Sequence, residues 1–224
     1  MRTQLLSSLA AGLALMTGAL TTVPAFADDD DIRGYAVTVT NLTRGQVLTP
    51  PVVISHNQDF TLFAPGAPPS SELATLAEDG VTGPLLGLLV TLPAVYDSAV
   101  STGPVLPGHS VTVEITTSGK FNTISAVGML ASTNDGFFAV KGVSAPKKGG
   151  VTVEAEAYDA GSEANTESCA FIPGPPCGHA GVRDTTGAEG YVHIHAGIHG
   201  IGGLTPAMHD WRNPVAQVTI HRIQ

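Results

Sequence analysis

The alternation of apolar and polar residues is the feature that most limits what this chain can fold into. In residues 35–40, Tyr35, Val37 and Val39 alternate with smaller or more polar residues, and residues 111–116 repeat the pattern. Side chains on a β-strand point alternately to its two faces, so this pattern is typical of strands buried on one face. Further segments with strand character are 52–55, 122–130, 137–143, 151–157, 191–195 and 215–223.

Helical periodicity is scarce, and glycine, proline and asparagine separate the expected strands. Short strands joined by such turns favour an antiparallel β-sandwich or barrel. The exception is residues 71–92, where leucines lie on one helical face, Gly80 can end a first helix and Pro84 can begin a second. We therefore predict an all-β fold, an antiparallel β-sandwich with a short helical insertion around residues 71–92.

The N-terminus has the three parts of a secretory signal peptide. Arg2 supplies a positive charge, residues 5–20 form an apolar stretch, and Ala25-Phe26-Ala27 has the small-x-small form of a cleavage site. The apolar stretch is shorter than the ~20 residues that span a bilayer, which disfavours an uncleaved anchor. We expect cleavage after Ala27, a secreted or periplasmic protein without a membrane span, an acidic disordered tail over residues 28–33, and one domain over residues 34–224.

Cleavage after Ala27 would remove Arg2 and change the net charge from −9 to −10. The remaining chain has no basic stripe that could neutralise phosphates, so we expect no nucleic-acid partner. An acidic surface attracts cations, and it also keeps a protein soluble through self-repulsion. Composition does not choose between these two effects.

Cys169 and Cys177 are the only cysteines, and they flank a proline-rich segment. Export exposes thiols to oxidation, so we expect a disulfide that closes a short, stiff loop. The alternative is a pair of thiolate metal ligands. A zinc site built from cysteines would need a second pair, which the chain lacks.

Two expected loops concentrate oxygen ligands. Residues 132–136 include Asp135, and residues 158–167 include Asp159 and Glu163. Calcium takes about six to eight oxygen ligands from carboxylates, carbonyls and water, and loops between strands can supply them. Asn-Asp-Gly is also a common turn sequence, and acidic residues in loops are commonly only solvated. The spacing alone leaves both interpretations open.

Residues 35–41, 50–57, 132–140 and 158–163 together resemble the spondin N-terminal domain in its bacterial form, and the similarity runs from about Tyr35 to Ile223. Its most specific piece is Tyr-Asp-Ala-Gly-Ser-Glu at 158–163, which is similar to aromatic-Asp-Ala-Gly-Thr-Asp in the animal family. The resemblance implies a C2-like β-sandwich, extracellular adhesion, and calcium bound through aspartates of the two loops. Those positions correspond to Asp135, Asp159 and Glu163, and Gly136 stands where the animal proteins usually have tryptophan.

The segment 190–200 is rich in histidine. On a strand, His193 and His195 would point to the same face roughly 7 Å apart, so both imidazoles could bind one transition metal. His199 could be a third ligand, and His56 or His209 a fourth. The pattern incompletely resembles the copper strand of copper/zinc superoxide dismutases and the His-x-His of cupins. The alternative is a row of histidines satisfied by hydrogen bonds in a polar sheet face.

Sequence signals for nucleophilic catalysis are poor, since the chain has neither a Gly-x-Ser-x-Gly elbow nor a phosphate loop. We therefore expect a secreted, calcium-binding, spondin-like domain without enzymatic activity. Its role would be that of an adhesion or ligand-binding module with an extracellular or cell-surface partner. The alternative is a histidine-based copper or zinc protein, either a metal carrier or an oxidoreductase.

Overall fold

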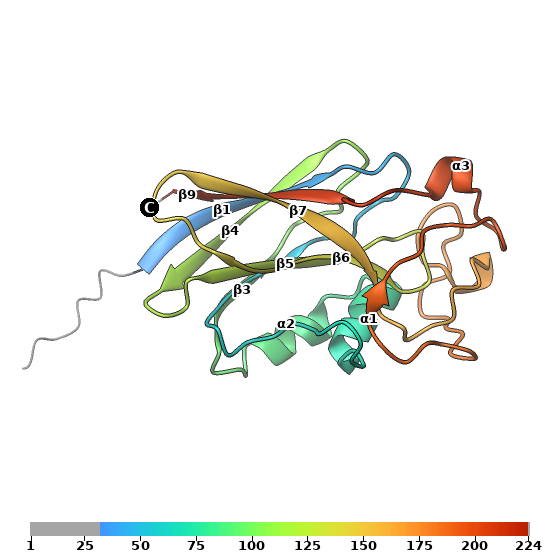
Figure 1. Ribbon diagram of the computed structural model, residues 1–224, viewed down its shortest axis with the longest axis horizontal. Helices are drawn as coiled ribbons and strands as arrows, with labels where there is room; N and C mark the ends of the chain where they lie inside the picture. The colour runs from blue at the N-terminus through green and yellow to red at the C-terminus, as the bar shows by residue number, and fades with distance from the viewer. Residues whose placement is uncertain (1–31, 224) are drawn as a thin grey trace, which may run out of the picture.

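The computed structural model describes residues 32–223 and consists mainly of antiparallel β-sheet (Figure 1). This confirms the predicted all-β fold with a short helical insertion. The strands are β1 (Ile32–Asn41), β2 (Val52–His56), β3 (Val95–Val100), β4 (Ser110–Ser118), β5 (Thr123–Met129), β6 (Gly136–Ser144), β7 (Gly150–Asp159), β8 (His193–Ile194) and β9 (Ala216–Arg222). The helices are α1 (Ser71–Asp79), α2 (Gly83–Leu89), α3 (Pro206–His209) and the 3-10 turn η2 (Cys169–Phe171).

The strands form two layers that share β7. Their order is β3-β2-β5-β6-β7-β9-β1-β4, and β8 pairs with β7. Residues 156–159 of β7 pair with β6, whereas residues 150–155 pair with β9. At the opposite edges, Asp97 of β3 accepts hydrogen bonds from the backbone N–H and the hydroxyl of Thr116 in β4, at 2.9 and 2.7 Å. The sandwich is therefore nearly closed into a barrel.

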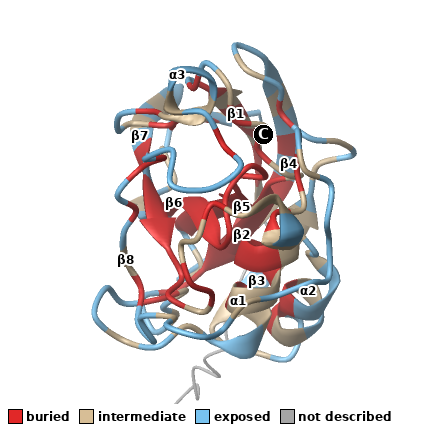
Figure 2. Ribbon diagram, turned by 90° about the vertical axis from the view of Figure 1, so that its right-hand side faces the viewer, coloured by how far each residue is buried: buried red, intermediate tan, exposed pale blue. Residues whose placement is uncertain are grey.

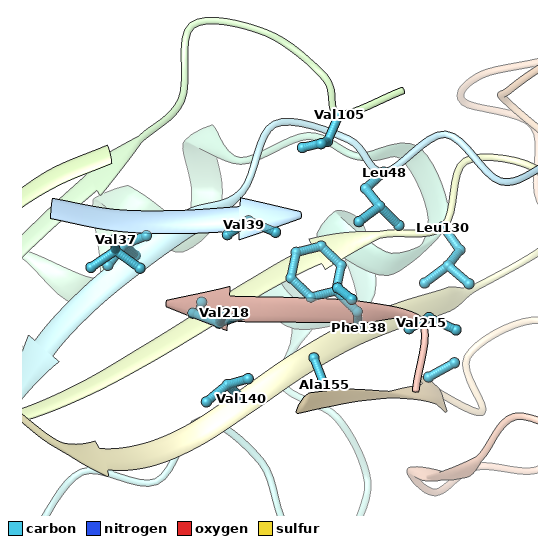
Figure 3. Packing of buried hydrophobic residues seen from close by; sticks show 14 of the residues in the cluster. Val37, Val39, Leu48, Val105, Leu130, Phe138, Val140, Ala155, Val215 and Val218 are labelled. Atoms are coloured by element: carbon cyan, nitrogen blue, oxygen red, sulfur yellow. The ribbon is translucent and has the colours of Figure 1, made fainter. Parts of the chain in front are cut away.

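The main core lies between the two layers (Figure 3). Val39 of β1 lies beside its partner Val218 of β9, and these side chains and Val37 face Phe138 of β6 across the core; all four are fully buried. This packing explains the alternation in residues 35–40: every second side chain enters the core, and the side chains between them face away from it.

A second core lies between the other face of β2, β5 and β6 and the two helices of the insertion. Its leucines from α1 and α2 cover Val52, Ile54 and Phe137. Because both faces of β2 and β5 are covered, every residue of these two strands is buried. Helix α1 ends at Gly80, whose φ of 67° is the left-handed conformation that favours glycine at a helix C-terminus.

The first strand begins two residues earlier than the expected start of the domain at residue 34. Ile32 and Arg33 pair with Ser118 and Thr117, so β1 includes two residues that the sequence assigned to the tail over residues 28–33. The rest of that tail and the expected signal peptide over residues 1–27 lie outside the described residues. Within the part of the chain that the structure describes, none of the helices has the length and apolar character needed to cross a membrane.

The long loops gather at one end of the sandwich, at the right of Figure 1 and facing the viewer in Figure 2. They are residues 130–135, 160–192 and 195–215. Backbone hydrogen bonds link them, including Gly174 N–H to the carbonyl of Ala131 at 2.8 Å and Gly203 N–H to that of Glu167 at 2.6 Å. A disulfide joins Cys169 to Cys177 and closes the expected loop. Most of the predicted site residues lie in these loops or, like Asp159 and His193, at the strand ends next to them, whereas His56 lies in β2.

Candidate metal centre

Asp135 and Asp159 are neighbours at the loop end of the sandwich. Asp159 is the last residue of β7 and is paired with Gly136, the first residue of β6. The N–H of Ala160 donates to the backbone carbonyl of Asp135 at 3.1 Å, which continues the ladder by one step. Both carboxylates are fully buried. The pairing of β6 with β7 thus brings the two loops together.

One oxygen of Asp135 organises the loop after β7. Its Oδ2 accepts the N–H groups of Ser162 and Glu163 at 2.7 and 3.0 Å, and the hydroxyl of Ser162 at 3.2 Å. Its Oδ1 is buried and accepts no hydrogen bond from the described residues. Burial, together with repulsion from Asp159, raises the pKa of Asp135 to about 7.

The two carboxylate oxygens of Glu163 also differ, since one accepts a hydrogen bond and the other does not. Its Oε1 accepts the N–H of Asp184 at 3.0 Å, whereas its Oε2 is buried without a hydrogen-bond donor in the range 32–223. Burial is the main cause that raises the pKa of Glu163 to about 8. Two buried carboxylates of the expected calcium set therefore each retain an oxygen atom that is free to bind a proton or a cation.

Asp159 belongs to a second group of ligand atoms, formed with Glu189 and His193. One atom from each side chain lies within 4.8 Å of the other two, so the group could hold a metal ion. The pairing of β7 with β8 places Asp159 opposite His193. The distances from His193 Nε2 are 3.4 Å to Asp159 Oδ1 and 4.0 Å to Glu189 Oε2. Burial raises the pKa of Asp159, although Asn165 and His193 partly oppose it.

The other histidines have different partners. The ring of His195 is buried against Trp211, with 4.9 Å between ring centroids, and its Nδ1 accepts the N–H of Gly197 at 3.0 Å. Burial lowers the pKa of His195 to about 3, so the ring is neutral. His199 is exposed. The structure therefore does not place His195 or His199 in the group that contains His193.

The two histidines named as a fourth ligand also lie elsewhere. His56 has its Nδ1 2.7 Å from the carbonyl of Asn57 and its Nε2 2.8 Å from the hydroxyl of Ser125. His209 has its Nδ1 3.2 Å from the carbonyl of Thr205. Each of these two rings therefore has a hydrogen-bond partner outside the group that contains His193.

Glu189 was not among the predicted ligands. It lies in the irregular segment between β7 and β8, where no spacing distinguishes it from other acidic residues. The one sequence feature that links the two residues is their spacing, since Glu189 precedes His193 by four residues.

A scan against protein-family models finds no match for this chain, and a search of curated proteins finds none. The resemblance to spondin domains therefore stays a prediction.

Proposed function

We propose that this chain is an exported calcium-binding domain without enzymatic activity, whose loop end binds an extracellular or cell-surface ligand. The observation that carries the proposal is that two buried carboxylate oxygens, Asp135 Oδ1 and Glu163 Oε2, each accept no hydrogen bond from the described residues. Leaving a buried polar atom without a partner costs roughly 1–3 kcal/mol. Calcium is suited to such a place because it binds carboxylate oxygens in irregular geometry.

The cation would act on the shape of the loops. Without it, Asp135 and Asp159 repel each other in a buried place, and both carboxyl groups have raised pKa values. A bound calcium ion would offset this repulsion and hold the segment 160–163 against the start of β6. The long loops around it would then present a fixed surface to a ligand, which is how loops on a rigid scaffold commonly bind.

The test is a thermal unfolding experiment in calcium and in chelator. Ligand binding stabilises the folded protein by about 2.7 kcal/mol at a hundredfold excess over Kd. For a domain of this size that corresponds to a rise in Tm of roughly 5–10 °C. Asp135→Asn should remove most of the shift, because the amide keeps an oxygen for the N–H groups of Ser162 and Glu163 but replaces the free oxygen. The calcium-free Tm should stay the same or rise, since a buried charge is lost.

Glu114→Gln is the matched control. Glu114 is exposed on β4, so its loss removes a charge of the same kind without touching the loops and should leave the calcium shift intact. Metal analysis of the same sample establishes whether calcium was removed by the chelator. A calcium-free protein whose Tm does not respond to millimolar calcium would contradict the proposal.

A further inference from the structure

We infer that Asp159, Glu189 and His193 form a second site, which binds a divalent transition metal of the zinc type. The site shares Asp159 with the proposed calcium site but does not depend on calcium. It also differs from the histidine cluster expected from the sequence, because it takes only His193 from that cluster and adds two carboxylates.

The first argument is the orientation of the His193 ring. Its Nδ1 lies 3.0 Å from the carbonyl oxygen of Ile194. Because a carbonyl oxygen only accepts, this contact places a proton on Nδ1, and in the neutral ring Nε2 then has a lone pair. The Nε2 atom is buried and has no hydrogen-bond partner among residues 32–223. It faces oxygens of Asp159 and Glu189, an arrangement that is repulsive unless Nε2 carries a proton or a cation lies between the three atoms.

The second argument is the set of hydrogen bonds that orient the carboxylates of Asp159 and Glu189. The side-chain amide of Asn165 donates to Asp159 Oδ2 at 2.5 Å and reaches Glu189 Oε1 at 3.5 Å. The N–H of Gly161 donates to Asp159 Oδ1 at 2.7 Å. One amide therefore holds both carboxylates side by side and leaves Glu189 Oε2 directed toward His193. Ligands of bound metals are commonly oriented by such outer hydrogen bonds, including a histidine N–H that donates to a carbonyl.

The ligand set and the distances indicate the class of metal. Zinc binds histidine nitrogen and carboxylate oxygen at about 2.0–2.2 Å, so two ligands of a tetrahedral site lie about 3.4 Å apart. The distance from Asp159 Oδ1 to His193 Nε2 is 3.4 Å. Glu189 is 4.0 Å from the same nitrogen, and its side chain is 31% exposed, which leaves it room to move inward. An imidazole ligand favours zinc or copper over calcium, which prefers oxygen.

The arrangement leaves one position of a tetrahedral metal open. Three protein ligands account for three positions, and the fourth would take water or a donor atom of a bound partner. His193 and Glu189 are both partly exposed, so a metal can enter from the solvent side while the buried Asp159 holds it from below. The competing explanation is a protonated His193, whose single positive charge would offset part of the negative charge of the same two carboxylates without any metal.

The experiment is a titration of chelator-stripped mature protein with zinc, followed by calorimetry, and with cobalt, followed by its visible absorption. We expect one zinc per chain, and we expect His193→Gln and Glu189→Gln each to weaken zinc binding at least tenfold. Asn165→Ala should weaken it roughly 10- to 100-fold, because it removes the support of the carboxylates. His109→Gln, which changes an exposed histidine on the β3–β4 connection, should have no effect.

The two sites can be separated by variants. His193→Gln should lose zinc binding and keep the calcium-induced rise in Tm. Asp135→Asn should keep zinc binding and lose the calcium-induced rise. Asp159→Asn should lose both zinc binding and the calcium-induced rise. Near-ultraviolet circular dichroism shows whether each variant is folded, and the exposed Glu189 gives a test that does not disturb the core. Absent zinc uptake by the wild-type protein, or unchanged uptake by folded His193→Gln and Glu189→Gln proteins, would overturn the site in favour of a protonated His193.

Discussion

Asp135 and Glu163 hold protons more tightly in the folded protein than in the unfolded chain. Burial raises their pKa values from 3.8 and 4.5 to about 7 and about 8. At pH values between the unfolded and folded pKa values, the folded state binds more protons, so the free energy of unfolding falls as pH rises. We expect the Tm of the metal-free protein to decrease from pH 5 to pH 8.

Thermal unfolding in chelator across this pH range measures the effect. Glu163→Gln, which cannot ionise, should give a shallower dependence on pH. Saturating calcium should also reduce the slope, because a bound cation stabilises the charged carboxylates that high pH produces. A metal-free protein that gains stability between pH 5 and pH 8 would contradict the assignment of these two groups.

Gly136 is a second residue whose neighbours dictate its identity. A Cβ atom there would lie 2.7 Å from Thr133 Oγ1 and 2.9 Å from Cδ2 of the buried His195 ring. Gly136→Ala should therefore destabilise the protein by about 1–3 kcal/mol, as overpacking does. Gly87→Ala in α2 is the control, because no atom outside the adjoining backbone of α2 lies within 4 Å of the added Cβ, and it should stabilise slightly. Urea denaturation of the two variants would check the difference.

The chemistry of single residues predicts only part of the candidate site. Asp135 and Asp159 stand out in the sequence because acidic residues in loops suit calcium, and His193 stands out because it alternates with His195 on an expected strand. Glu189 does not, because its place beside His193 depends on how the chain between β7 and β8 returns to the sheet. The different contacts of His193 and His195 have a similar origin, since β8 ends at Ile194 and does not extend over both histidines.

At the scale of elements, Arg183 fastens the loop between β7 and β8 to helix α1. Its guanidinium lies 2.5 Å from Glu78 Oε2 and 2.9 Å from Asp79 Oδ2, and Glu78 is nearly fully buried. Arg183→Ala should cost about 1–3 kcal/mol, because it leaves the buried Glu78 carboxylate without its counterion. Arg183→Lys should recover part of this, since it restores the charge but not the forked contact.

Urea denaturation measures the loss of stability, and limited proteolysis shows whether residues 178–192 open first. Lys148→Ala removes an exposed positive charge on another turn and serves as the control. Equal stability of Arg183→Ala and the wild-type protein would mean that other contacts hold the loop, such as the hydrogen bonds from Gly181 N–H to Asp79 Oδ1 and from Asp184 N–H to Glu163 Oε1.

The sequence predicts strands correctly where every second residue is buried. The alternation in residues 35–40 and 111–116 predicts β1 and β4 because one face of each strand packs in the core. Strand β3 was missed because its residues are only partly buried or exposed, so burial does not alternate along it. The passage of β7 from one layer to the other has no sequence signal either, because it is a property of which neighbours pair with each half.

At the scale of the whole molecule, the disulfide makes the loops of the candidate site depend on whether the protein is in oxidising or reducing surroundings. Cys177 packs against the core between the layers. Within the loop that the disulfide closes, Gly174 N–H donates to the carbonyl of Ala131 at 2.8 Å, and the carbonyl of Pro175 accepts the hydroxyl of Ser132 at 2.5 Å. These contacts hold the segment that leads to Asp135. An oxidising location outside the cytoplasm would therefore support the geometry of the proposed metal sites.

The last prediction follows from this connection and from the signal peptide proposed for residues 1–27. Protein recovered from the exported fraction should begin at Asp28, and its mass should be two hydrogens below that of the reduced chain, because Cys169 and Cys177 are joined. Reduction should cost roughly 2–3 kcal/mol of stability, the usual gain for closing a short loop. Intact-mass spectrometry and unfolding with and without reductant measure both effects. Residues 28–224 produced in a reducing cytoplasm are the control, and should match the reduced protein in mass and Tm. Intact Met1 in a membrane fraction, or two free thiols in exported protein, would contradict the prediction.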